Sequence, residues 1–173
     1  MRRFSSEQRQ LVCETTALAQ SLVSHYYVLA PREWAGMRYE VRTQTELEPI
    51  ELLDTVLAQV ICYEYVKRVG QQVLEQGDLY RICLQDNRIL ATLAGGCELD
   101  LASLLLYVLT HELVHVVRFG QHLQRLDLSF EERVGEEQSV DLITQRIVGF
   151  SPGEETTRNL WLLPRYSRMA RHA

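Results

Sequence analysis

Two patterns are missing from this chain of 173 residues, and each absence excludes a class of protein. The four cysteines never form a C-x-x-C pair, which disfavours a four-cysteine zinc site and a disulfide framework. No apolar run reaches the roughly 18 residues that a membrane span needs, and a polar stretch follows Arg2 and Arg3 where a secretory signal would be apolar. We therefore expect reduced cysteines, a cytoplasmic location and no membrane contact.

Lysine is also scarce, and the formal net charge is -5. Nucleic-acid binding needs clustered Lys and Arg against the phosphates, so this charge balance argues against a nucleic-acid partner. Aliphatic, aromatic and cysteine residues make up 46% of the chain, which is enough for a packed core. The length fits one compact domain over residues 1–173, and nothing in the sequence fixes the oligomeric state.

Apolar periodicity divides this domain into three parts. Residues 1–76 are predicted to be mainly helical, with helices over 5–30 and from Pro49 to about Gly77 and a short extended segment over 37–45. Residues 77–150 are the predicted core, with strands over 79–84 and 89–93, an almost wholly apolar helix over 99–119 and a capped helix over 129–148. Residues 151–173 are a tail, which Trp161, Leu162 and Leu163 are expected to tie down. The predicted class is α+β, with a small antiparallel sheet or hairpin packed on a buried helix.

That buried helix carries the motif His111-Glu112-Leu113-Val114-His115. Residues four apart share one face of an α-helix, so the two imidazoles project side by side and can hold one zinc ion at roughly 2.0–2.1 Å. Glu112 is displaced by about 100° around the axis, where its carboxylate can serve as general base toward a water that zinc acidifies. Two ordinary histidines are the alternative, but unpaired buried polar groups cost on the order of 1–3 kcal/mol each.

A catalytic zinc needs a third protein ligand. Glu137 and Asp141 share one face of the next predicted helix, so Glu137 can ligate and Asp141 can accept a hydrogen bond from a ligand histidine. On a straight helix His122 would lie about 10 Å along the axis from His115, which disfavours it as a ligand. Glu136 and Glu132 stay open as ligands, although acids near a helix N-terminus also suit its dipole. Spacing does not mark a residue that would stabilise an oxyanion; the candidates are Tyr107, Arg118, His122 and Tyr166.

His111-Glu112-x-x-His115 followed by Glu137-x-x-x-Asp141 resembles the gluzincin arrangement, which thermolysin-like and other bacterial peptidases share. The resemblance covers roughly residues 79–148 and implies a minimal zincin-like fold. It implies zinc held by His111, His115 and Glu137, with Glu112 as general base and Asp141 behind the ligands. It also implies a peptide or protein substrate that lies along an edge strand before the active-site helix, for which residues 89–93 are the candidate.

The expected function is therefore a zinc-dependent metallopeptidase. One alternative is a non-catalytic zinc-binding domain with an interaction or regulatory role. Glu112 argues against it, because a structural zinc site has no use for that carboxylate and favours four closed ligands. Another alternative is a regulatory or toxin-like module that cleaves a single target by the same chemistry.

Overall fold

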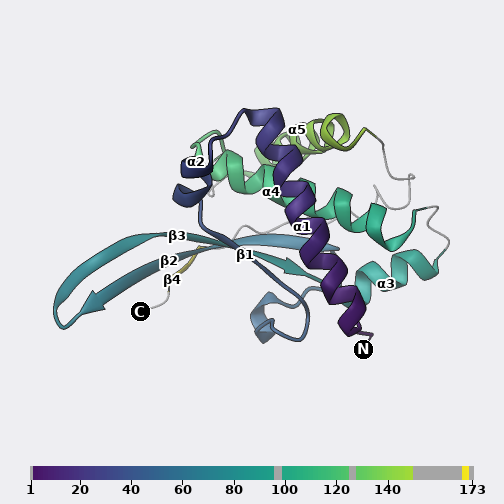
Figure 1. The fold of residues 1–173 in the computed structure, drawn as a ribbon, viewed down its shortest axis with the longest axis horizontal. Helices are drawn as coiled ribbons and strands as arrows, with labels where there is room; N and C mark the ends of the chain where they lie inside the picture. Colours follow the sequence, from purple (N-terminus) through teal and green to yellow (C-terminus); the bar gives the residue numbers. More distant parts are fainter. Residues whose placement is uncertain (1, 96–98, 125–127, 150–168, 172–173) are drawn as a thin grey trace.

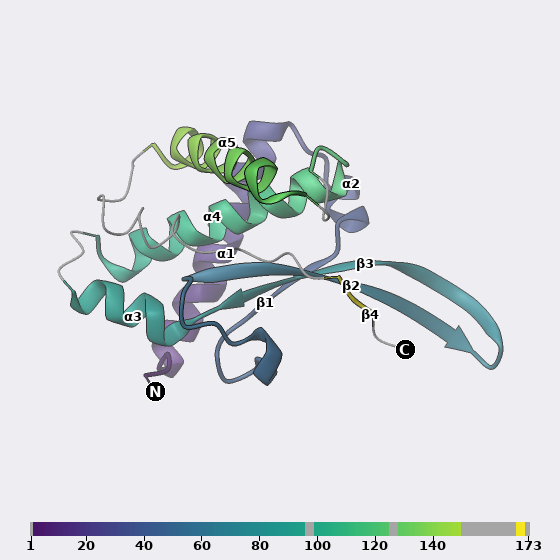
Figure 2. The same ribbon diagram turned by 180° about the vertical axis from the view of Figure 1, so that it is seen from behind.

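Helices lie on one face of a four-stranded mixed sheet in the computed structural model, which gives the chain an α+β fold (Figures 1 and 2). The structure describes residues 2–95, 99–124, 128–149 and 169–171. Cys97, Tyr166 and the predicted anchor at Trp161, Leu162 and Leu163 lie outside these residues. The strand order is β1-β3-β2-β4. The strands are β1 (Tyr39–Arg42), β2 (Ala58–Val69), β3 (Gln72–Leu84) and β4 (Met169–Arg171).

A hairpin packs on the predicted central helix, but β2 and β3 form it, and only the first of the two predicted strands, over 79–84, belongs to it. β2 and β3 are antiparallel and turn at Gly70, whose φ of 61° suits a residue without a Cβ atom. β1 pairs in parallel with β3, and β4 pairs in parallel with β2, so the sheet is mixed rather than purely antiparallel. The far half of the hairpin extends beyond the helices (Figure 1).

The central helix is α4 (Leu101–Gly120), which runs between α1 (Ser6–Tyr27) and α5 (Phe130–Val148) and also contacts β2. Asp100 caps α4 by accepting a hydrogen bond of 2.7 Å from the Ser103 amide. By length and composition α4 would suit a membrane, but 72% of its most apolar window is buried inside the fold. A helix that is apolar nearly all round is therefore explained here by its central position in the core.

The other long helices begin and end where capping residues allow. Ser5 forms a capping box with Gln8 at the start of α1. The capping box predicted at the start of α5 is also present, between Ser129 and Glu132. Gly149 ends α5 in the left-handed conformation. α1 ends earlier than predicted, at Tyr27, and Pro31 begins the short helix α2 (Pro31–Gly36) instead of closing α1.

Two predicted elements are wrong. Residues from Pro49 to Gly77 do not form a helix: only η1 (Pro49–Glu51) is a short 3-10 turn, and most of the remainder is β2 and the first half of β3. The β-branched and aromatic side chains of this segment favour strands, and their chance recurrence at helical spacing suggested a helix. The description of residues 1–76 as helical therefore fails over 58–76.

The predicted strand over 89–93 is the helix α3 (Asp86–Ala94). The Gln85 carbonyl accepts hydrogen bonds from Arg88 and Ile89, so the expected turn is the first turn of this helix. Ile89 is fully buried while Leu90 and Leu93 pack at the core margin, which is helical spacing. The expected substrate-binding edge strand at 89–93 is consequently excluded.

A buried ion-pair cluster holds the chain before β2 against the face of the sheet opposite the helices. Glu51 is fully buried and accepts hydrogen bonds from the Tyr63 hydroxyl and from Arg81 Nη1 at 2.8 Å. Arg81 also donates from Nε to Glu40 at 2.5 Å. Burial opposes ionisation of Glu51, but these bonds and one from the Glu48 amide outweigh it, so the pKa of Glu51 lies below its ordinary value of 4.5.

We predict that Glu51→Gln lowers the free energy of unfolding by roughly 2 kcal/mol at neutral pH, because it leaves the half-buried Arg81 guanidinium with one carboxylate partner instead of two. A carboxylate whose pKa is lowered by folding stabilises the protein above the unfolded-state pKa, and this contribution is lost as the pH falls through the folded-state pKa. Chemical denaturation of wild type and variant should therefore converge below pH 4.5. The exposed pair of Glu75 with Arg38 is the control, and Glu75→Gln should change stability by less than about 1 kcal/mol. A gap between wild type and Glu51→Gln that is constant with pH would contradict the prediction.

Candidate metal centre

Three side chains predicted as ligands come together where α4 packs on α5. His111 and His115 lie one turn apart on α4, Glu137 comes from α5, and the three candidate ligand atoms lie within 4.8 Å of one another. Glu137 faces both rings, with Oε2 at 3.3 Å from His111 Nε2 and Oε1 at 3.3 Å from His115 Nε2. Both Nε2 atoms are therefore directed at one carboxylate, an arrangement that a cation between them would satisfy.

The two histidines of this group are buried, whereas the glutamate is partly exposed to solvent. His111 and His115 are 1% and 4% exposed, whereas the Glu137 side chain is 24% exposed. The imidazoles are thus fixed inside the fold, and the carboxylate side of the group reaches solvent. Two nitrogens and one oxygen are three protein donors, which leaves a tetrahedral ion one open position for water or substrate.

Electrostatics at the group favour a positive charge. Burial by itself would lower the pKa of His115, but the charges of Glu137 and Glu112 and the hydrogen bonds that His115 makes to Glu137 and Gln124 raise it above its ordinary value. Glu112 is 1% exposed on the same helix, so its carboxylate is held inside the fold, where its charge acts on His115. The raised pKa of His115 shows that its surroundings favour a positive charge, which a divalent cation would also supply.

Glu136, the neighbour of Glu137, forms an ion pair with Arg118 and does not face the two histidines. Both of its carboxylate oxygens accept from Arg118, one from Nε and one from Nη2 at 3.0 Å. This two-point contact joins α4 to α5 beside the candidate centre. Glu136 is not in the candidate group, and Arg118, which was a candidate for oxyanion stabilisation, is held by this contact.

Asp141 joins the same two helices on the other side of Glu137. It is 3% exposed and accepts a hydrogen bond from the buried Tyr107 hydroxyl and one of 3.0 Å from Gln145. The bond from a ligand histidine to Asp141 stays a prediction. Tyr107 is fully buried one turn before His111, so it supports the helix contact and is poorly placed to reach a substrate.

His122 has a different role from the one considered for it. Its φ is 56°, in the left-handed region, and its side chain is exposed. Its amide donates to Phe119 O at 3.0 Å and the next amide, from Leu123, donates to Arg118 O at 2.8 Å, which is the Schellman pattern that ends a helix. His122 is not in the candidate metal group; nor is Glu132, whose carboxylate closes the α5 capping box.

Sequence reasoning missed one polar neighbour of the group. Gln124, two residues beyond the left-handed turn, accepts a hydrogen bond through Oε1 from His115 Nδ1 at 3.0 Å. No spacing rule marks this glutamine, because its contact depends on the reversal of the chain at His122. The left-handed conformation of a histidine was itself not visible in the sequence.

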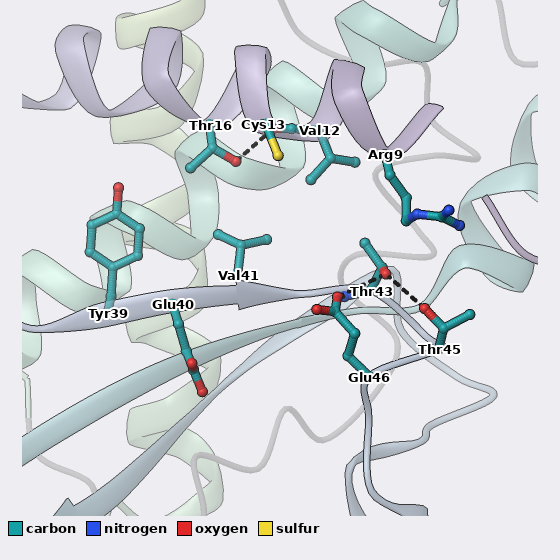
Figure 3. A pocket seen from close by; sticks show the side chains of 10 residues that line it. All are labelled: Arg9, Val12, Cys13, Thr16, Tyr39, Glu40, Val41, Thr43, Thr45 and Glu46. Carbon is teal, nitrogen blue, oxygen red and sulfur yellow. Dashed lines mark hydrogen bonds between the residues drawn. The ribbon is translucent and has the colours of Figure 1, made fainter. Parts of the chain in front are cut away.

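A separate cavity of about 820 Å³ lies between α1 and β1, away from the three candidate ligands (Figure 3). Side chains from one face of α1 line it on one side, and β1 and the loop after it line the other. None of His111, His115 and Glu137 lines this cavity.

No known protein family, curated protein or solved structure matches the chain. The function is therefore inferred from the side-chain geometry of the α4–α5 contact.

We predict that zinc, used as the probe, binds wild type at about one ion per chain, as a single three-ligand site implies. His115→Ala and Glu137→Ala should abolish this binding in metal analysis after dialysis. His122→Gly should retain the ion and be at least as stable as wild type, because glycine adopts the left-handed conformation without strain. Loss of zinc from His122→Gly would instead identify His122 as a ligand.

We also predict that Glu136→Ala weakens zinc binding by roughly 10- to 100-fold without abolishing it, since removal of a supporting contact misplaces the neighbouring ligand. A competition titration against a chromophoric chelator measures this difference. Glu131→Ala, which removes an exposed acid from the first turn of the same helix, is the matched control and should bind zinc as wild type does. Complete loss of zinc from Glu136→Ala with retention in Glu137→Ala would reverse the two assignments.

Proposed function

We propose that this protein is a zinc-dependent metallopeptidase of the zincin type. The observation that carries the proposal is the convergence of His111, His115 and Glu137 within 4.8 Å, with Glu112 buried on the same helix. Two imidazoles and one carboxylate are the donor set of a known class of catalytic zinc sites. A helix bearing the two histidines, packed on a hairpin and followed by the helix bearing the glutamate, agrees with a minimal gluzincin arrangement.

The burial and charge of the four residues indicate a role for each of them in hydrolysis. Zinc, when bound, would supply Lewis acidity toward a carbonyl oxygen and would lower the pKa of a water molecule. Glu112 would take the proton from that water as it attacks the carbonyl carbon, and would deliver a proton to the leaving amine as the peptide bond breaks. His111, His115 and Glu137 would hold the ion, and the exposed side of Glu137 gives the substrate an approach.

Three donors and a buried base favour catalysis over a purely structural role. A structural zinc site is closed by four protein ligands, whereas the candidate group contains three in the part of the chain that the structure describes. The buried carboxylate of Glu112 on the same helix also favours catalysis, because a structural site has no use for it. We propose a peptide or protein as the substrate and a cytoplasmic location, without a nucleic-acid or membrane partner.

We predict that Glu112→Gln retains zinc but loses at least about 100-fold in hydrolysis of a casein or mixed-peptide substrate, as expected for removal of a general base. Product release is followed by mass spectrometry beside metal analysis of the same sample. Glu33→Gln, at an exposed position of α2, is the control and should cleave as wild type does.

Hydrolysis by Glu112→Gln at the wild-type rate would exclude the proposed mechanism. Wild-type protein that holds zinc and cleaves nothing in the same assay would favour the alternative of a non-catalytic zinc-binding interaction domain.

A further inference from the structure

The end of α4 folds back onto the helix that carries the histidines. After His122 the backbone reverses, and the amides of Leu123 and Gln124 both donate to Arg118 O, at 2.8 and 3.1 Å. This places residue 124 beside residue 115, although nine positions separate them in sequence. Gln124 is only half-buried, so its side chain lies at the margin of the site and not within the apolar core.

The atoms in contact determine which residue donates the hydrogen bond between Gln124 and His115. An amide oxygen only accepts hydrogen bonds, so the 3.0 Å contact from His115 Nδ1 to Gln124 Oε1 requires the proton to be on Nδ1. In a neutral imidazole the other nitrogen, Nε2, then carries the lone pair. That nitrogen is the one directed at Glu137, at 3.3 Å.

We infer that Gln124 is a positioning residue that holds His115 in the Nδ1–H form and presents Nε2 to the metal. The inference rests on the proposed function, since it assigns a residue to the same site. Metal-bound histidines are commonly fixed in this way by an acceptor on their second nitrogen, and loss of that acceptor weakens metal binding by roughly 10- to 100-fold. The Schellman turn at His122 is the backbone feature that brings this acceptor to His115.

An amide at this position has a chemical consequence that a carboxylate would not have. Gln124 is neutral, so it orients the ring without adding negative charge to a site that already contains Glu112 and Glu137. Replacement by glutamate keeps the acceptor, makes His115 a more basic ligand and adds attraction for a cation. The two substitutions Gln124→Leu and Gln124→Glu are therefore expected to change zinc affinity in opposite directions.

The test measures zinc dissociation constants for the full chain by chelator competition, without reference to hydrolysis. Gln124→Leu should bind zinc roughly 10- to 100-fold more weakly than wild type, and Gln124→Glu at least as tightly. Gln121→Leu is the control, since it removes an exposed glutamine from the same turn, and its affinity should be unchanged. Thermal unfolding of each metal-free variant separates this effect from a loss of folding.

A second readout reports the hydrogen bond itself. In zinc-loaded wild type, proton NMR should show a slowly exchanging His115 Nδ1–H signal, and this signal should be lost or shifted upfield in Gln124→Leu. An unchanged signal and an unchanged zinc affinity in Gln124→Leu would overturn the inference while leaving the proposed function intact. Failure of wild type to bind zinc would remove the proposed function and the role of Gln124 with it.

Discussion

The contact of α4 with α5 is the constraint on which the candidate site depends. Three polar connections cross it in order: Tyr107 to Asp141, the two histidines to Glu137, and Arg118 to Glu136. Positions rise along α4 while their partners fall along α5, so the helices lie antiparallel and every connection fixes the same register. A slip of one helical turn would break all three together, which makes the site a property of the whole helix pair.

This register resolves an energetic conflict within α4. The helix is surrounded by core side chains, and it nevertheless contains two histidines and a glutamate that are almost fully buried. Such groups are tolerated in a core only where charge and hydrogen bonding are matched. Glu137 faces the imidazoles, while Arg118 and Tyr107 bond to the acids Glu136 and Asp141 on the neighbouring helix. The candidate ligands are therefore held in place by contacts that do not themselves bind a metal.

The parts of the structure that the sequence predicted are those fixed by short-range rules. The nearly continuous apolar sequence of α4, with its H-E-x-x-H motif, and the Ser129 capping box of α5 are local features, and they predicted the helix pair and its candidate ligands. The segment from Pro49 to Gly77 was misjudged because apolar residues three or four apart are also compatible with a strand that is buried on both faces. Here tertiary pairing with β3 decided between helix and strand.

The residues around the ligands were harder to predict for a different reason. Arg118 and Gln124 matter through contacts across a helix interface or a chain reversal, and no sequence period connects such partners. A left-handed histidine is uncommon, so nothing suggested that the chain would return to α4 at His122. His122 and Arg118 were considered as metal or oxyanion partners because of their chemistry, whereas their described contacts belong to the support of the site.

The contacts that support the candidate ligands also affect the net charge of the centre. Two neutral imidazoles, the Glu137 carboxylate and the Glu112 carboxylate carry two negative charges, which a divalent ion balances. Glu136 adds no net charge because Arg118 pairs with it, and Gln124 adds none because it is an amide. A divalent ion would therefore reduce the desolvation cost of the carboxylates at this helix contact. Proton uptake by Glu112 during hydrolysis would then be matched by the negative charge that develops on the substrate oxygen, so the net charge of the site would stay constant through the step.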